Sequence, residues 1–447
     1  MVQVGNRTVF VTMIIIVVAI IIDNSIVGIA TSSGGMRSSL QDISLFIIMV
    51  IIFTVGQYII LLFVKGKYLD AADRAVIVSS HVRWISRITT SFQYALLAIL
   101  VSVIFQIVFT SSYHIYSLIF PILISYGLSI FLLSYLAKHF FAWYRINRSL
   151  VVLFYGLSMS LVSINGIIVI IYLDVGFTDN PIYIKSVRSL TGSYASPNAA
   201  LSSAFTLTAI LFFVLTWIST AILLRHYSRR LGKVKYWVLV SIPLAYFLTQ
   251  FQPLFLFTFA EFRISDPVHF GIVYTVLFSI SKPLGGVLFG IAFWLVARSL
   301  SGSIVKSYLL ISAYGMTLLF ASDQPTSLIL APYPPFGLVT ICFMGLASYL
   351  LYIGIYSSAL SVSEDSRLRQ SIKKAALKES QQFLDAIGSA EMEQEVERRV
   401  IKLSKRTKGL MEQETGISTS LDDDDVKRYL EEVLIELKSM KKNDHNH

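Results

Sequence analysis

Long apolar runs alternate with short polar segments along the first 360 residues of the chain. A transmembrane helix needs about twenty apolar residues to cross a hydrocarbon core of about 30 Å. Ten runs are long enough or nearly so, and we predict that each forms a span: 9–30, 44–64, 91–111, 114–136, 149–173, 201–224, 236–260, 269–297, 308–322 and 336–360. The pattern therefore predicts an all-α polytopic transmembrane helix bundle of about ten spans over residues 1–360.

From residue 361 onward the pattern changes to narrow apolar stripes at helical spacing among many charged residues. This predicts a C-terminal cytoplasmic helical tail over 361–447, with one helix ending at Gly388 and a second one after it. A third helix is predicted to begin at Asp422–Asp425, whose carboxylates suit a helix N-terminus better than a cation site. The stripes within 364–442 could pack on one another, on a second copy or on a protein partner.

The basic residues indicate how the spans are oriented. The tail carries 16 bases and 18 acids, and the remaining 21 bases and 9 acids give residues 1–360 a net charge of +12. Sixteen of those bases fall in loops on one side of the predicted spans, and four fall on the other: Arg37, Lys185, Arg188 and Arg263. Because cytoplasmic loops carry the excess of Lys and Arg, we expect a cell-membrane protein with both termini cytoplasmic. Four tryptophans near the same span ends, as in an interfacial belt, agree: Trp84, Trp143, Trp237 and Trp294.

The first span also fits a second interpretation. Arg7 precedes an apolar stretch, and Gly28-Ile29-Ala30 has the small-x-small pattern of a cleavage site. Residues 1–30 could therefore be a signal peptide, and cleavage would leave nine spans in the same orientation. Farther along, residues 65–90 combine apolar positions at helical spacing with arginines, which predicts an amphipathic helix on the inner leaflet.

The predicted eighth span contains the most unusual residues of the chain. Lys282 lies almost midway along 269–297, where a lysine costs a few kcal/mol even on the gentlest insertion scale. Pro283 removes a backbone donor and disfavours helix at the preceding residue, and Gly285 and Gly286 add backbone freedom. We therefore predict a broken helix with a charge near the membrane midplane, a feature of transporter binding sites.

A buried lysine needs a partner, a water path or the loss of its proton. Three acids could face Lys282: Asp23 in the first span, and Glu261 and Asp323 nearer the outer end of the bundle. Asp23 is the deepest of the three, so we take Lys282, Pro283, Gly285, Gly286 and Asp23 together as the candidate binding residues. A purely structural ion pair is an equally good interpretation of the same pattern.

Other classes of chemistry lack their sequence signatures. The chain contains none of the H-E-x-x-H, G-x-S-x-G or Walker patterns, so we predict no enzyme, no metal and no cofactor. The one cysteine, Cys342, lies in an apolar run and cannot form an intramolecular disulfide. No clustered basic patch with aromatic readers is present, so we expect membrane lipid and not nucleic acid as the partner of the basic surface.

Three strings of the sequence carry a family resemblance: Ser281-Lys282-Pro283-Leu284-Gly285-Gly286, Tyr333-Pro334-Pro335-Phe336-Gly337 and Ser357-Ser358-Ala359-Leu360-Ser361-Val362-Ser363. They resemble strings of a family of archaeal multispan membrane proteins with a cytoplasmic helical tail. The resemblance covers roughly the last 170 residues and implies location and architecture, but no activity.

Two functional hypotheses follow. In the first, the chain is a membrane sensor or assembly protein that couples the bundle to the cytoplasmic tail, as the long tail favours. In the second, it is a secondary transporter or channel built around the broken eighth span at Lys282.

Overall fold

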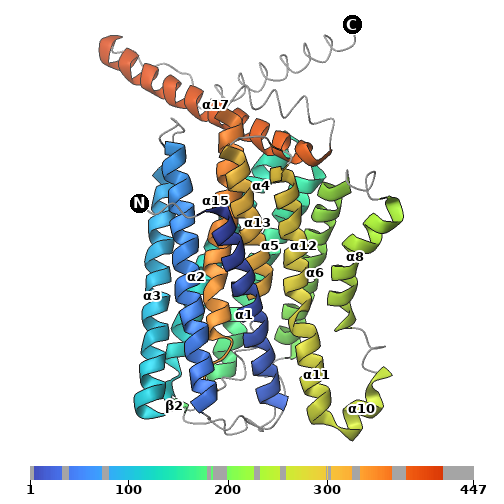
Figure 1. The fold of residues 1–447 in the computed structure, drawn as a ribbon. Helices are drawn as coiled ribbons and strands as arrows, with labels where there is room; N and C mark the ends of the chain where they lie inside the picture. The colour runs from blue at the N-terminus through green and yellow to red at the C-terminus, as the bar shows by residue number, and fades with distance from the viewer. Residues whose placement is uncertain are drawn as a thin grey trace.

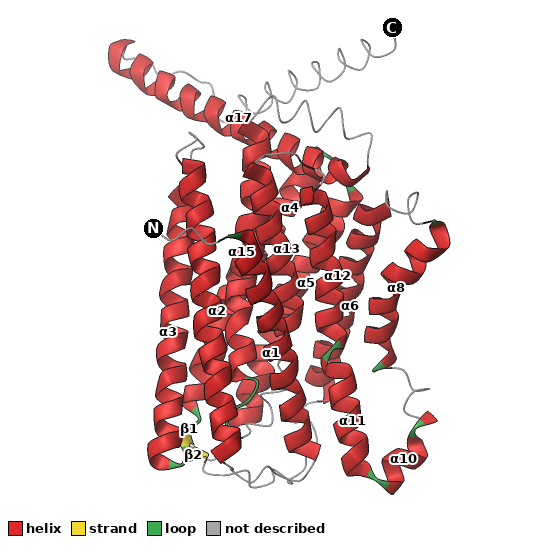
Figure 2. Ribbon diagram, in the orientation of Figure 1, coloured by secondary structure: helices red, strands yellow, loops and turns green. Residues whose placement is uncertain are grey.

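The computed structural model is an all-α bundle. The description covers residues 5–32, 40–72, 80–178, 183–184, 199–225, 232–251, 258–298, 300, 304–324, 333–364 and 379–415. Long helices run up and down the bundle, and the helix α17 lies across one end of it (Figures 1 and 2). We call this end the tail end.

The helices follow the predicted apolar runs closely. In chain order they are α1 Asn6–Ser32, α2 Leu40–Ala72, α3 Ser80–Thr110, α4 Tyr116–Ile146, α5 Leu150–Thr178, α6 Ala199–Leu224, α8 Lys233–Thr249, α10 Ala260–Ser265, α11 Pro267–Ser279, α12 Ser281–Arg298, α13 Ile304–Ser322, α15 Leu338–Glu364 and α17 Glu379–Thr415. Within the described residues, nine stretches are long and apolar enough to cross a membrane, with α11 and α12 together forming one of them. The helical bundle is thus confirmed, and the chain is a multi-pass membrane protein.

The predicted seventh span, 236–260, is less regular than the others. It corresponds to α8, which has 17 residues, together with a segment that includes residues outside the description and the short α10. Helix α6 ends near the tail end, whereas α11 begins at the opposite end, so the connection through α8 runs along the bundle (Figure 1). A helix of 17 residues measures about 25 Å, which is slightly less than a typical hydrocarbon core.

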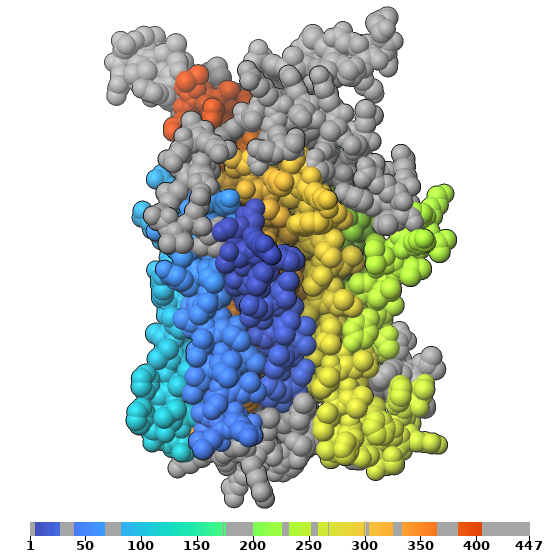
Figure 3. Space-filling view, viewed as in Figure 1, coloured from blue at the N-terminus to red at the C-terminus, as the bar shows by residue number. Residues whose placement is uncertain are grey.

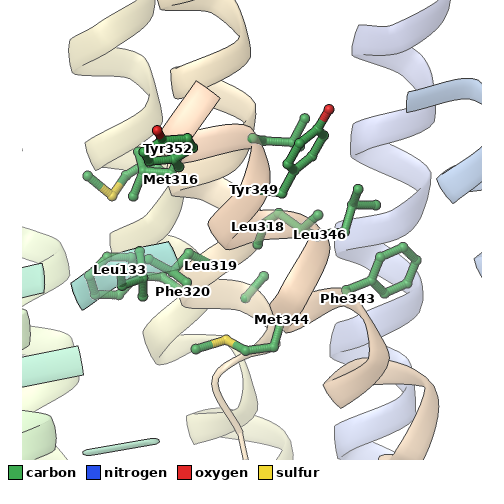
Figure 4. Packing of buried hydrophobic residues seen from close by; sticks show 14 of the residues in the cluster. Leu133, Met316, Leu318, Leu319, Phe320, Phe343, Met344, Leu346, Tyr349 and Tyr352 are labelled. Atoms are coloured by element: carbon green, nitrogen blue, oxygen red, sulfur yellow. The ribbon is translucent and has the colours of Figure 1, made fainter. Parts of the chain in front are cut away.

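Helix α15 is the centre of the bundle. Every residue in its most apolar window is buried, although the segment is as apolar as helices that face lipid. It packs most extensively against α13 and α4, and α1 and α2 cover it on the face shown in Figure 3. Figure 4 shows Met316 of α13 beside Tyr352 of α15 within this core. The last predicted span is therefore the one most isolated from lipid.

Two short strands join loops at the end opposite the tail. Strand β1 (Tyr113–His114), between α3 and α4, pairs antiparallel with β2 (Tyr183–Ile184), which lies between α5 and α6 in the chain. Tyr113 also stacks on Tyr333, with ring centroids 6.0 Å apart. Burial raises the pKa of Tyr113 above its ordinary value, so its hydroxyl stays protonated.

The segment 65–90 differs from the prediction of a separate amphipathic helix. Residues 65–72 continue α2 and residues 80–90 begin α3, and the intervening 73–79 lie outside the described residues. Val82 and Ile85, two of the apolar positions in this segment, are buried in the bundle and do not face the membrane surface. Their apolar spacing reflects packing between helices, because two long helices extend past the apolar region together.

The tail also differs from its prediction. Gly388 does not end a helix, because α17 continues through it from Glu379–Thr415. A Cβ atom at Gly388 would lie 2.2 Å from Cγ1 of Val362, so this glycine allows α17 to cross the end of α15 closely. The predicted third tail helix lies outside the described residues.

Candidate functional site

The predicted break in the eighth span lies at Ile280. Helix α11 ends at Ser279 and α12 begins at Ser281, so Lys282 and Pro283 occupy the first turn of α12. Proline is tolerated there because the first-turn N–H groups of a helix have no intrahelical acceptor. The two helices together form a 31-residue apolar stretch, Val268–Arg298, with Lys282 near its middle.

The last four carbonyls of α11 all accept hydrogen bonds from side chains, which compensates for the break. Ser279 Oγ donates to Val276 O at 2.9 Å, Tyr246 of α8 donates to Leu277 O, Ser281 Oγ donates to Phe278 O at 2.7 Å, and Gln324 Nε2 donates to Ser279 O at 3.1 Å. The last of these replaces the hydrogen bond that Pro283 cannot donate to the carbonyl four residues before it. Polar backbone at this depth is therefore satisfied by protein, as a membrane interior requires.

Lys282 forms a buried ion pair with Asp323, the residue that follows α13. Its Nζ lies 2.8 Å from Asp323 Oδ2 and donates a second hydrogen bond to the Asp323 backbone carbonyl at 2.7 Å. The side chains are only 14% and 3% exposed. The ammonium also lies 5.9 Å and 5.8 Å from the ring centroids of Phe205 and Phe212 in α6. The charge is thus neutralised by one carboxylate and surrounded by aromatic faces, an arrangement that favours a cation.

The glycines after Lys282 act as packing residues within α12. A Cβ atom at Gly285 would lie 2.4 Å from the ring of Phe213, and one at Gly286 would lie 2.8 Å from the backbone oxygen of Thr317. Gly290, four residues after Gly286, approaches the same helix, and a Cβ atom there would meet the side-chain hydroxyl of Thr317. Gly286 and Gly290 form the small-xxx-small spacing that lets membrane helices approach closely, and here it brings α12 against α13.

Asp23, the favoured partner of Lys282 in the sequence interpretation, is engaged elsewhere. Its Oδ2 accepts hydrogen bonds from the Gly337 N–H at 3.0 Å and from Thr340 Oγ1 at 2.6 Å. These groups lie at the start of α15, so the carboxylate of α1 caps that helix and complements its dipole. Lys282 instead pairs with Asp323, which was also among the candidates, because α13 ends beside the break. Glu261 is exposed on α10.

Asp266 begins α11 at the far end of the same span. Its side chain accepts a hydrogen bond from the His269 backbone N–H at 3.1 Å, and Pro267 occupies the first helical position. This hydrogen bond holds the pKa of Asp266 below its ordinary value. The broken span is therefore capped at its start, at the end of the bundle opposite the tail, as well as at its centre.

A second polar cluster lies where α17 packs on the tail end of the bundle. Trp143 of α4 donates from Nε1 to Glu391 Oε2 at 2.9 Å, and both side chains are fully buried. Asn147 Nδ2 donates to the Ala386 carbonyl at 2.8 Å, and Arg398 lies 3.6 Å from Glu391 Oε1. We call Trp143, Asn147, Ala386, Glu391 and Arg398 the tail junction.

Aromatic rings connect the tail junction to the bundle core. His139 of α4 lies 4.9 Å from the ring of Tyr356 in α15 and 5.7 Å from Trp143. The buried atoms His139 Nε2 and Tyr352 Oη have no hydrogen-bond partner within the described part of the chain. The interface thus contains buried polar atoms whose hydrogen-bonding capacity is not used by the described residues.

Sequence reasoning missed the tail junction. Trp143 was interpreted as part of an interfacial belt, but its indole is buried under α17, whereas Trp84, Trp237 and Trp294 are exposed as a belt requires. One signal was available. Glu391 continues the stripe of Phe383 and Ile387 at steps of four residues, and an acid on an apolar stripe indicates a specific buried partner.

Two further kinds of chemistry that the described residues could support are metal binding and a reactive cysteine. Across them, no group of three or more His, Cys, Asp or Glu side chains could hold a metal ion. Cys342 is fully buried in α15. Searches for similar proteins found no family model, no curated protein and no solved structure that matches the chain.

Proposed function

We propose that this protein is a membrane sensor or assembly protein in which the helical bundle is coupled to a cytoplasmic tail through α17, with both termini in the cytoplasm. The observation that carries the proposal is the buried hydrogen bond between Trp143 and Glu391, because it joins the tail to a membrane-spanning helix. The excess of basic residues in loops at the tail end supports the cytoplasmic assignment.

The contacts of α17 suit it to report on the bundle. It packs against α4, α5, α6 and α15, and its buried face includes Phe383, Leu384 and Ile387. Because α15 fills the centre of the bundle and α4 reaches its opposite end, a shift of either helix would move the surface on which α17 rests. Coupling of this kind needs a packed element with two arrangements, and α17 is our candidate for that element.

Spin labels in the full-length protein in nanodiscs would test this coupling. Exposed positions, Arg83→Cys on α3 and Lys402→Cys on α17, take the labels, whereas the buried Cys342 stays unlabelled. We expect one narrow distance distribution that broadens in Trp143→Phe and stays narrow in the control Trp237→Phe, an exposed tryptophan of α8. The same distribution in all three proteins would contradict the proposal, because α17 would then be held independently of Trp143.

The tail also has apolar surface that the bundle does not cover. Val396 and Leu403 are 42% and 66% exposed and lie seven residues apart on α17, so they share one face. This supports a protein partner or self-association through the 364–442 segment. Mass measurement of the solubilised protein would show a dimer that Leu403→Glu dissociates, and a monomer at all concentrations would exclude self-association.

A secondary transporter or channel is the second candidate, and the ion pair at the broken span favours it. The Tyr126 hydroxyl of α4 is buried within electrostatic reach of Asp323 and has no hydrogen-bond partner within the described residues. A proton or cation passing the break would find these groups along its way. Liposomes loaded with a pH-sensitive dye would show proton flux that Lys282→Met/Asp323→Asn abolishes and the exposed control Lys306→Met preserves. Absence of proton and K⁺ flux with the unaltered protein would reject this candidate.

A further inference from the structure

A groove runs between α4 and α5 on the membrane-spanning part of the bundle. Its volume is about 610 Å³, and its apolar wall includes Phe141, Ile164 and Ile167. Two of its hydroxyls, those of Ser160 and Ser163, donate to carbonyls of their own helix at 3.0 Å. Their hydrogen bonds are therefore satisfied within α5, so a hydrocarbon chain in the groove would leave neither of these two donors unpaired.

Basic side chains lie at one end of this groove. Lys138 and Arg145 belong to its lining and lie seven residues apart on α4, which places them on one face of the helix. The exposed Arg148 lies two residues after the end of α4. Helix α4 contains no acidic residue, and the first acid of α5 is Asp174 near the opposite end of that helix. The charge that α4 and α5 themselves contribute near the groove is thus positive, with no described carboxylate on these two helices close to Lys138 or Arg145.

We propose that this groove binds one anionic phospholipid from the leaflet at the tail end, with its phosphate at Lys138 and Arg145 and an acyl chain along Phe141, Ile164 and Ile167. The lining of α4 runs from Ser134 to Arg145, about 16 Å at a rise of about 1.5 Å per residue, which matches the depth of one leaflet core. Basic pockets between spanning helices recognise anionic headgroups through charge and hydrogen bonding.

The geometry distinguishes this binding from general attraction between a basic protein and lipid. Arg145 lies next to the last residue of α4 at headgroup level, whereas Lys138 lies about 10 Å deeper and can extend its stem toward the same phosphate. A lysine inside the apolar zone is costly unless an anion or water meets it. A bound phosphate at the mouth of the groove would supply that partner.

Competition between two lipids in native mass spectrometry would test the proposal. The full-length protein is equilibrated in micelles with equal phosphatidylglycerol and phosphatidylcholine that carry the same chains. We expect the unaltered protein to retain one phosphatidylglycerol in several-fold preference. Lys138→Gln/Arg145→Gln should lose this preference at least fivefold. The control Lys233→Gln/Lys235→Gln removes the same charge from exposed positions on α8 and should keep it.

A second variant tests the contribution of the groove volume independently of the two basic residues. Ala142→Trp would fill the groove while leaving both bases in place, so we expect it to reduce retention of phosphatidylglycerol by a similar factor. Addition of glycerol phosphate, the headgroup without chains, should not displace the lipid. Equal loss in the α4 and α8 double variants, or retention by Ala142→Trp, would overturn the proposal, as would displacement by glycerol phosphate.

Discussion

The broken span and the tail junction both bury a charged side chain, but they differ in how exposed to solvent its oppositely charged partner is. At the break, Lys282 and Asp323 are both nearly inaccessible, so neither charge has water to replace its partner. At the tail junction, Glu391 is fully buried, whereas Arg398 is 52% exposed and Trp143 is neutral. When both partners of a charge pair are buried, the pair holds its helices together, because separation would leave two charges without water. When one partner is exposed, separating the pair costs less free energy, because water can replace the lost contact on that side.

The glycines of the two regions differ in the same way. At Gly290 an added Cβ would meet the backbone oxygen of Ala313 at 2.8 Å as well as Thr317 Oγ1. At Gly388 it would meet Val362 first through atoms of its side chain. Backbone cannot move aside without shifting a helix, whereas a side chain can rotate. The comparison therefore predicts that damage at the break affects the whole bundle and that damage at the junction releases only the tail.

The largest expected effect comes from removing one charge at the break. Lys282→Met would leave Asp323 buried without its cation, which typically costs about 3–5 kcal/mol. We expect a large fall in solubilised yield and melting temperature, with substantial recovery in Lys282→Met/Asp323→Asn. The matched pair Lys282→Met/Asp23→Asn should show no recovery, since Asp23 caps α15. Recovery with Asp23→Asn instead would mean that the pairing at the break has been assigned to the wrong acid.

The glycine contrast gives the second prediction. Gly290→Val should destabilise the whole bundle by about 1–3 kcal/mol through overpacking against α13. Gly388→Val should leave the melting temperature of the bundle unchanged but increase hydrogen exchange in α17. Gly127→Val is the control, because a Cβ atom there would meet nothing within 4 Å. Equal losses of bundle stability for Gly290→Val and Gly388→Val would remove the distinction between the two regions.

A smaller effect tests how the break is held. Gln324→Ala removes the donor to the Ser279 carbonyl and should cost about 1 kcal/mol, as a net hydrogen bond does. In a Pro283→Ala background the new backbone N–H can donate to that carbonyl, so the same change should cost much less. Melting temperatures of the four proteins form the double-mutant cycle. Strict additivity would show that Pro283 and Gln324 do not share this carbonyl.

The smallest expected effect concerns the exposed cap at the start of α11. Because the folded-state pKa of Asp266 is depressed, its stabilisation is present above the unfolded pKa of about 3.9 and is lost as the pH falls through the folded value. We expect Asp266→Ala to increase hydrogen exchange in the first turn of α11 at pH 7 and to make little difference at pH 2. A pH-independent difference would show that the cap does not act through its charge.

The apolar pattern predicted the helices well because each span must satisfy its own backbone in lipid. The break near Lys282 was also predictable, since Pro283 acts locally. For Gly285 and Gly286 the sequence did not distinguish backbone flexibility from close helix packing. A glycine that serves packing is recognised only by its neighbour on another helix, which the local sequence does not give. The spacing of Gly286 and Gly290 was the available signal for close packing.

Contacts between residues far apart in the sequence could not be predicted. Asp23 and Asp323 were both reasonable partners for Lys282, and only the position at which α13 ends decides between them. The relation between Trp143 and Glu391 spans 248 residues, and it depends on how α17 lies across α4. Helix periodicity identifies a buried face, but not which face of another helix meets it.

The cap on α15 has a consequence for the order in which this protein is made. Asp23 and the Gly337 N–H that it accepts from are 314 residues apart, which corresponds to about 15–60 s of translation at about 5–20 residues per second. The ribosome therefore releases α1 long before the helix that its carboxylate will bind. Among the candidate spans, α15 is also the most buried, so the central helix of the bundle is synthesised after the helices that surround it. Those helices remain in the bilayer without their central packing partner until α15 is inserted.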